Sequence, residues 1–132
     1  MAISDLASLA VREIGSRCRN QAPPAHVLFE ALCQPSRDPQ RPWLDLLEGE
    51  IPPRILESHY PDSVTWSSIW KDRPDAIIRF DLTRDAAGHG VGTDLRWTLY
   101  VDDSPPADEL VGQMTFRLNL LINGNLRYSF GQ

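Results

Sequence analysis

The chain has 132 residues, 42% of them hydrophobic, and a formal net charge of −5 at pH 7. A chain of this length forms one domain around a single core, and we expect that domain to span residues 1–132. The acidic balance argues against nucleic acid as a partner, because general nucleic-acid binders carry a basic patch. No apolar run reaches the length of a membrane span, so we expect no membrane partner.

The N-terminal residues and the cysteines predict a cytoplasmic protein. Met1–Ala10 contains Asp5 and no basic residue, which is not the pattern of a signal peptide. Cys18 and Cys33 match no metal-binding or redox spacing, and we expect both to be reduced thiols.

The first part of the chain predicts two short helices after a weak strand. Ala10–Asn20 is a weak strand candidate, because its apolar residues do not alternate cleanly with polar ones. Ala22-Pro23-Pro24 is typical of a helix start, and Pro35 should end that helix. A second short helix is expected over Pro42–Glu48, with Gly49 just past its end.

The second half predicts four antiparallel strands joined by short connections: Arg54–Tyr60, Val64–Trp70, Ala76–Thr83 and Asp94–Val101. The register that brings apolar residues together pairs Tyr60 with Val64, Trp66 with Phe80, and Phe80 with Trp97. Ser58 then falls opposite Trp66. On the other, solvated face of the sheet, Asp81 meets Arg96.

A long helix is expected over Pro105–Tyr128. Ser104 is its predicted N-cap, and Asp108 and Glu109 place negative charge in its first turn. An apolar stripe at helical spacing should cover the sheet: Leu110, Val111, Met114, Leu118, Leu121 and Ile122. Phe116 and Leu120 lie on the opposite side. They are either covered by the N-terminal segment or exposed as a contact patch, where they would form the seam of a homodimer.

No catalytic constellation is visible in the sequence. His26, His59 and His89 are not at metal-ligand spacing. The run Gly88–Gly92 lacks the Lys-Ser/Thr that follows a phosphate-binding loop. We therefore expect no metal, no cofactor and no catalytic residue.

The inner face of the predicted sheet collects tryptophan and phenylalanine side chains. These form either an ordinary aromatic core or the lining of a cavity. Ser58 and Ser68 favour a cavity, because both point inward in the predicted register and would supply its hydroxyl groups. The predicted ligand-binding residues are Ser58, Trp66, Ser68, Trp70, Ile78, Phe80, Trp97, Leu99, Met114 and Leu118.

Two stretches resemble the START-like superfamily, also described as SRPBCC or polyketide cyclase-like. Ala22–Leu32 (Ala-Pro-Pro-Ala-His-Val-Leu-Phe-Glu-Ala-Leu) resembles its first helix, which follows a strand. Gly92–Trp97 (Gly-Thr-Asp-Leu-Arg-Trp) resembles its late strand before the last helix. The resemblance implies an α+β helix-grip fold, in which an antiparallel sheet wraps over a long C-terminal helix with two short helices at one end.

The function implied by this resemblance is non-covalent binding of a small apolar or aromatic molecule between sheet and helix. Two alternatives are a cyclase- or aromatase-like enzyme and a protein-interaction module resembling the chaperone-activator branch. Family members have six strands after the short helices and this sequence predicts four, so we expect a small cavity. With no charged group predicted on the inner face, that cavity should prefer neutral ligands.

Overall fold

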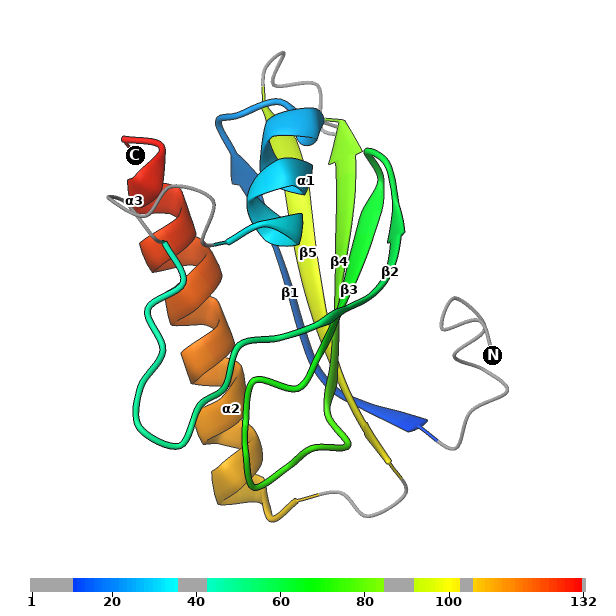
Figure 1. Ribbon diagram of the computed structural model, residues 1–132, viewed down its shortest axis with the longest axis vertical. Coiled ribbons are helices and arrows are strands. Elements are labelled where there is room, and N and C mark those ends of the chain that lie inside the picture. The colour runs from blue at the N-terminus through cyan, green and yellow to red at the C-terminus, as the bar shows by residue number, and fades with distance from the viewer. Residues whose placement is uncertain (1–10, 36–42, 85–91, 103–105, 132) are drawn as a thin grey trace.

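The computed structural model describes residues 11–35, 43–84, 92–102 and 106–131. An antiparallel five-stranded sheet with the order β1-β5-β4-β3-β2 carries a long C-terminal helix across one face (Figure 1). The strands are β1 (Val11–Gln21), β2 (Ile55–His59), β3 (Ser63–Ser67), β4 (Ile77–Arg84) and β5 (Thr93–Asp102). This α+β architecture is consistent with the helix-grip fold.

Strand β1 corresponds to the weak candidate Ala10–Asn20 and forms one edge of the sheet against β5. Its register shifts between Glu13 and Gly15, which interrupts the alternation of side chains. Arg17 lies opposite Trp97. Because directly opposed residues share a face, Arg17 belongs to the inner face. The expectation of an inner face without charged groups is therefore wrong.

The predicted register of β4 and β5 is confirmed: Phe80 pairs with Trp97, and Asp81 with Arg96. The predicted register of β3 and β4 is wrong, because Val64 rather than Trp66 lies opposite Phe80. Trp66 lies opposite Ile78 instead. The error is two residues, so every side chain keeps its predicted face.

The predicted β2–β3 pairing is also wrong. His59 pairs with Ser63 and Ser58 with Val64, so Ser58 does not face Trp66. Strand β2 is the other edge of the sheet, and there Ser58 is exposed. Tyr60, which was placed on the inner face, lies in the turn and is 67% exposed.

Helix α1 (Ala25–Cys33) is confirmed, whereas the second short helix is not present in the described part of Pro42–Glu48. Residues 43–47 have no regular secondary structure, and residues 48–49 form a turn. Trp43 and Leu44 are adjacent and both buried. Tertiary packing therefore determines the conformation of this segment, rather than a helical period.

The C-terminal helix consists of α2 (Asp108–Leu120), a π-helical turn η2 (Leu121–Leu126) and α3 (Arg127–Ser129). The predicted N-cap Ser104 lies outside the described residues. Asp108 and Glu109 occupy the first turn as expected. Among the described residues no helix has the length and hydrophobicity needed to cross a membrane.

The predicted stripe is buried from Met114 onward, and it extends to Leu126. Leu110, at the start of the helix, is exposed. Phe116 and Leu120 are 71% and 45% exposed. The described residues therefore leave both side chains open to solvent.

Helix α1 packs against β3 and β4, and buried aromatic side chains meet there. The indole of Trp66 stacks on Trp43 at 5.9 Å and meets Phe80 edge-on at 4.7 Å. Trp66 Nε1 donates to the carbonyl of Leu32 at 2.8 Å, and Trp43 Nε1 to that of Ala31 at 2.9 Å. These carbonyls belong to the last turn of α1, where the helix supplies no donor of its own.

Candidate ligand-binding hollows beside the C-terminal helix

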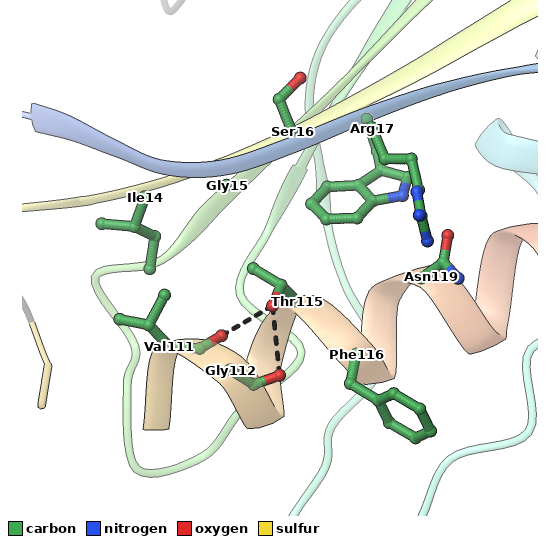
Figure 2. A pocket seen from close by; sticks show the side chains of 10 residues that line it. Ile14, Gly15, Ser16, Arg17, Val111, Gly112, Thr115, Phe116 and Asn119 are labelled. Atoms are coloured by element: carbon green, nitrogen blue, oxygen red, sulfur yellow. Dashed lines mark hydrogen bonds between the residues drawn. The ribbon is translucent and has the colours of Figure 1, made fainter. Parts of the chain in front are cut away.

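Two hollows flank helix α2. The first, which we call the β1–α2 hollow, has a volume of about 540 Å³ and lies between the edge of the sheet and the helix (Figure 2). From the sheet it is lined by Ile14, Gly15, Ser16, Arg17 and Trp97. From the helix it is lined by Val111, Gly112, Thr115, Phe116 and Asn119. Its size falls within the range of small-molecule sites.

Two glycines shape the β1–α2 hollow. At Gly15 the strand touches the helix, because a Cβ atom there would overlap Cγ2 of Thr115 and lie 3.7 Å from Cζ3 of Trp97. Gly112 lies one turn earlier on the helix, and a Cβ atom there would meet nothing within 4 Å. The hollow is therefore open beside Gly112 and closed at Gly15.

Some polar groups around this hollow have hydrogen-bond partners within the protein, and one group has none among the described residues. The hydroxyl of Thr115 donates within its own helix to the carbonyls of Val111 and Gly112, at 3.0 and 3.1 Å. Trp97 is 2% exposed, and its buried Nε1 has no hydrogen-bond partner among the described residues. A buried donor without a partner is unusual in a folded protein and calls for an explanation.

The second hollow, which we call the loop hollow, has a volume of about 410 Å³ and lies on another side of α2. The segment Leu47–Glu50, the turn after β3 and the helix face line it together. The complete lining is Leu47, Glu48, Gly49, Glu50, Trp70, Asp72, Arg73, Leu110, Gln113, Met114 and Arg117.

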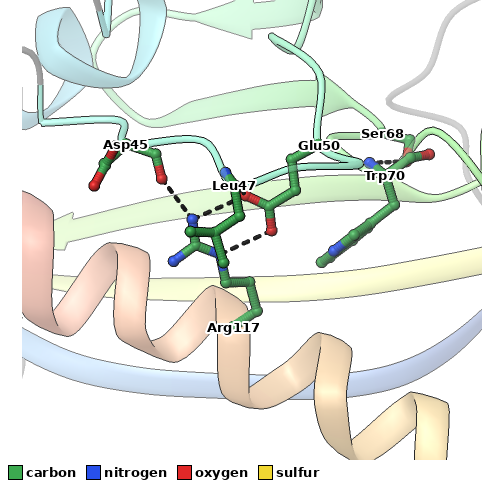
Figure 3. Close-up of polar contacts among 6 residues, drawn as sticks. All are labelled: Asp45, Leu47, Glu50, Ser68, Trp70 and Arg117. Carbon is green, nitrogen blue, oxygen red and sulfur yellow. Dashed lines mark hydrogen bonds and ion pairs between the residues drawn. The ribbon is translucent and has the colours of Figure 1, made fainter.

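An ion pair between Glu50 and Arg117 joins two walls of the loop hollow (Figure 3). Arg117 donates from Nε to Oε2 and from Nη2 to Oε1 of Glu50, both at 2.8 Å. The backbone N–H of Leu47 also donates to Oε1, at 2.8 Å, and Arg117 reaches the carbonyl of Asp45. This network ties the segment 45–50 to the helix.

Burial raises the pKa of Glu50, but the bonds from Arg117 and Leu47 outweigh burial and leave the pKa below its ordinary value of 4.5. Glu50 is therefore ionised at neutral pH. Its two oxygens are already occupied by Arg117 and Leu47, so the carboxylate acts as a structural clamp rather than as a free acid or base.

The ten predicted ligand-binding residues fall into three groups: those that line one of the two hollows, those that are buried in the core, and the two serines. Trp97 lines the β1–α2 hollow, and Trp70 and Met114 line the loop hollow. Five are fully buried in the core: Trp66, Ile78, Phe80, Leu99 and Leu118. The two serines, Ser58 and Ser68, form the third group.

Neither serine matches the inward-pointing free hydroxyl that the sequence suggested. Ser58 is exposed. Ser68 is buried, but its Oγ accepts from the backbone N–H of Trp70 at 2.9 Å and donates to the carbonyl of Trp70 at 3.1 Å. This hydroxyl is used by its own turn.

The sequence analysis missed the four residues that β1 contributes to the hollow, namely Ile14, Gly15, Ser16 and Arg17. The strand was recognised as a candidate but was not placed in the sheet. The signal was available, since the family resemblance places a strand before the first helix. Pairing that strand with the late strand at Gly92–Trp97 would have brought Arg17 to the inner face.

The described residues offer no group of three or more His, Cys, Asp or Glu side chains that could hold a metal ion. Both cysteines are free thiols, and Cys18 is exposed. Burial raises the pKa of the Cys33 thiol, which makes it a weaker nucleophile at neutral pH.

No protein-family model and no curated protein matches the sequence. Among solved structures, the crystal structure of CalU16 from Micromonospora echinospora is similar, with a TM-score of 0.62 and 16% sequence identity. The match covers 83% of this chain and 70% of that one. At this identity the likeness concerns the fold alone, and it is consistent with a helix-grip fold.

Proposed function

We propose that the protein binds a small apolar or aromatic molecule non-covalently in the β1–α2 hollow. The observation that carries this proposal is an open space of about 540 Å³, bounded by the apolar side chains of Ile14, Trp97, Val111 and Phe116 with a few polar groups among them. Ligand sites are typically concave, largely apolar and supplied with a few polar groups.

The composition of the lining favours binding over catalysis. A cyclase- or aromatase-like reaction needs a proton donor or acceptor beside the ligand. The ten lining residues of this hollow include no carboxylate, imidazole or thiol. The clamp Glu50 lines the loop hollow instead.

Gly112 allows a direct test of binding in this hollow. Gly112→Leu places a large side chain in open space and replaces a poor helix former with a good one. We expect the variant to be as stable as wild type or more stable, and to lose binding of the neutral fluorescent probe N-phenyl-1-naphthylamine. Gly112→Ala is the matched control, because it makes the same change in the helix without filling the space.

Probe fluorescence and thermal melting of the three proteins decide the question. A ligand of the native state should raise the melting temperature of wild type and of Gly112→Ala. Probe binding that is unchanged in Gly112→Leu would show that the probe occupies another site. Absence of binding to wild type, for this probe and for a library of apolar compounds both neutral and acidic, would contradict the proposal.

A protein-interaction module is the second candidate, and the exposure of Phe116 and Leu120 supports it. These two side chains lie one turn apart on α2, where they present an apolar patch. Sedimentation of wild type and Phe116→Lys tests self-association through this patch. A dimer that dissociates on substitution supports the interaction module, whereas a monomer at high micromolar concentration argues against the homodimer.

A further inference from the structure

The free polar groups of the β1–α2 hollow are hydrogen-bond donors. An indole N–H donates and cannot accept. The N–H groups of the buried Trp43 and Trp66 are satisfied by backbone carbonyls, whereas that of Trp97 has no partner in the described part of the chain. The tryptophan whose N–H lacks a partner is the one that lines the hollow, although the nitrogen atom itself is buried, so the accessible donors have to come from other lining residues.

Arg17 adds a permanent positive charge to the same surface. It lies directly across the β1–β5 ladder from Trp97, on the same face, and it lines the hollow. No ion pair or hydrogen bond holds its guanidinium within residues 11–35, 43–84, 92–102 and 106–131. A guanidinium offers two parallel N–H groups, which match the two oxygens of a carboxylate.

Asn119 supplies a second accessible donor. Its side-chain oxygen accepts from Asn123 at 2.7 Å, which leaves its own amide N–H groups available. Figure 2 shows Arg17 and Asn119 at one end of the hollow and Ile14 and Val111 at the other. The hollow is therefore apolar at one end and rich in donors at the other.

Strand β1 carries a net positive charge, which favours an anionic ligand beside it. Strand β1 carries Arg12, Arg17 and Arg19 but a single acid, Glu13, although the whole chain has a net charge of −5. Glu13 lies opposite Tyr100, which is on the outer face, so its carboxylate does not neutralise Arg17 inside the hollow. The edge of the sheet beside α2 is locally positive.

We propose that the β1–α2 hollow selects small apolar or aromatic carboxylic acids, which bind as carboxylates. The carboxylate accepts hydrogen bonds from Arg17 and from the side-chain amide of Asn119, and the apolar body of the ligand packs against Ile14, Val111 and Phe116. This inference rests on the proposed binding function and names its ligand class. It reverses the preference for neutral ligands that the sequence suggested, because that preference assumed an inner face without charge.

Two probes of the same shape test the selectivity. 2-Naphthoate and 2-naphthamide share a ring system and differ in whether the attached group is a carboxylate or a neutral amide. By titration calorimetry at neutral pH, we expect wild type to bind the acid about tenfold or more tightly than the amide. Arg17→Gln should remove this preference, because it should weaken the acid by about tenfold more than it weakens the amide.

Three further variants distinguish specific hydrogen bonding by Arg17 from attraction of the acid by the positive charge of β1 in general. Arg12→Gln removes the same charge from the same strand outside the hollow lining, so it should keep the preference for the acid. Arg17→Lys keeps the charge but not the two parallel N–H groups, so it should retain only part of the preference. Asn119→Ala should weaken both probes, because the amide of Asn119 can donate to a carboxylate or to an amide carbonyl.

Equal affinity of wild type for the two probes would overturn the inference, as would a preference that survives Arg17→Gln or disappears in Arg12→Gln. If N-phenyl-1-naphthylamine binds and Gly112→Leu blocks it while the acid is not preferred, the proposed function stands and this inference fails. If none of the three probes binds to wild type, both fail.

Discussion

Two tryptophans on the inner face of the same sheet have opposite surroundings. Trp66 lies under helix α1, where it stacks on Trp43, meets Phe80 and donates its N–H to the carbonyl of Leu32. Trp97 lies near the β1 edge, where it borders a hollow and its N–H has no partner among the described residues. One end of the core is filled and its polar groups are satisfied, whereas the other end is open and one donor is free. Residues of a structural core and residues of a binding site can therefore share one sheet face and one residue type.

The largest expected effect tests whether the buried face of α2 holds the helix on the sheet. Met114→Asp should cost about 4 kcal/mol or more and leave the domain unfolded or molten, because Met114 is 2% exposed and a carboxylate there would have no partner. Phe116→Asp is the control, and it should change stability by less than about 1 kcal/mol because Phe116 is largely exposed. Chemical denaturation measures both. A Met114→Asp protein that melts cooperatively near the wild-type temperature would show that the helix does not dock by this face.

The same substitution at the two tryptophans tests the comparison directly. Trp66→Phe should cost about 2–4 kcal/mol, because it leaves the buried carbonyl of Leu32 without its donor and creates a space in the filled end of the core. Trp97→Phe should cost less than Trp66→Phe, because Trp97 is also buried but its N–H has no partner among the described residues to lose. Equal losses of unfolding free energy would mean that the two ends of the core do not differ energetically.

The contact at Gly15 sets where the hollow ends. Gly15→Ala should cost about 1–3 kcal/mol through overpacking, since the added methyl group would overlap Cγ2 of Thr115. Thr115→Ser removes that atom and keeps the hydroxyl bonds within the helix, so the double variant Gly15→Ala/Thr115→Ser should recover most of the loss. Urea unfolding of the four proteins gives the coupling between the two sites. Additive effects would place the helix farther from β1 than the structure does.

The smallest expected effect concerns the clamp between Glu50 and Arg117. The pKa of Glu50 is lowered in the folded state, so its contribution to stability is present above the ordinary pKa of 4.5 and is lost as pH falls below that value. Burial opposes the effect of Arg117 and Leu47 on this pKa, so the net dependence should be modest. Glu50→Gln should flatten the loss of stability between neutral pH and about pH 3 relative to wild type. Parallel curves for the two proteins would show that Glu50 does not contribute.

The sequence predicted the parts of the fold in which local pattern and burial agree. Strands β4 and β5 lie inside the sheet and alternate apolar with polar residues, so pairing the apolar side chains identified the register of Phe80 and Trp97. The register was wrong by two residues between the interior strands β3 and β4, and the edge strands were also difficult to place. Both β1 and β2 have an irregular register, at Glu13/Gly15 and at Ile55/Glu57, which removes the alternation that the prediction relied on.

The sequence by itself determined the fold class, the long C-terminal helix and the division of the central strands into an apolar and a solvated face. Those features follow from hydrophobic periodicity, which each segment carries locally. The tertiary structure decided where space remains and which polar groups lack partners. Arg17, Gly15 and Trp97 meet α2 only because β1 pairs with β5, although β1 precedes β5 in the chain by more than 70 residues. A hollow arises from the packing of segments that are distant in the sequence, so the hydrophobic pattern of either segment alone does not predict it.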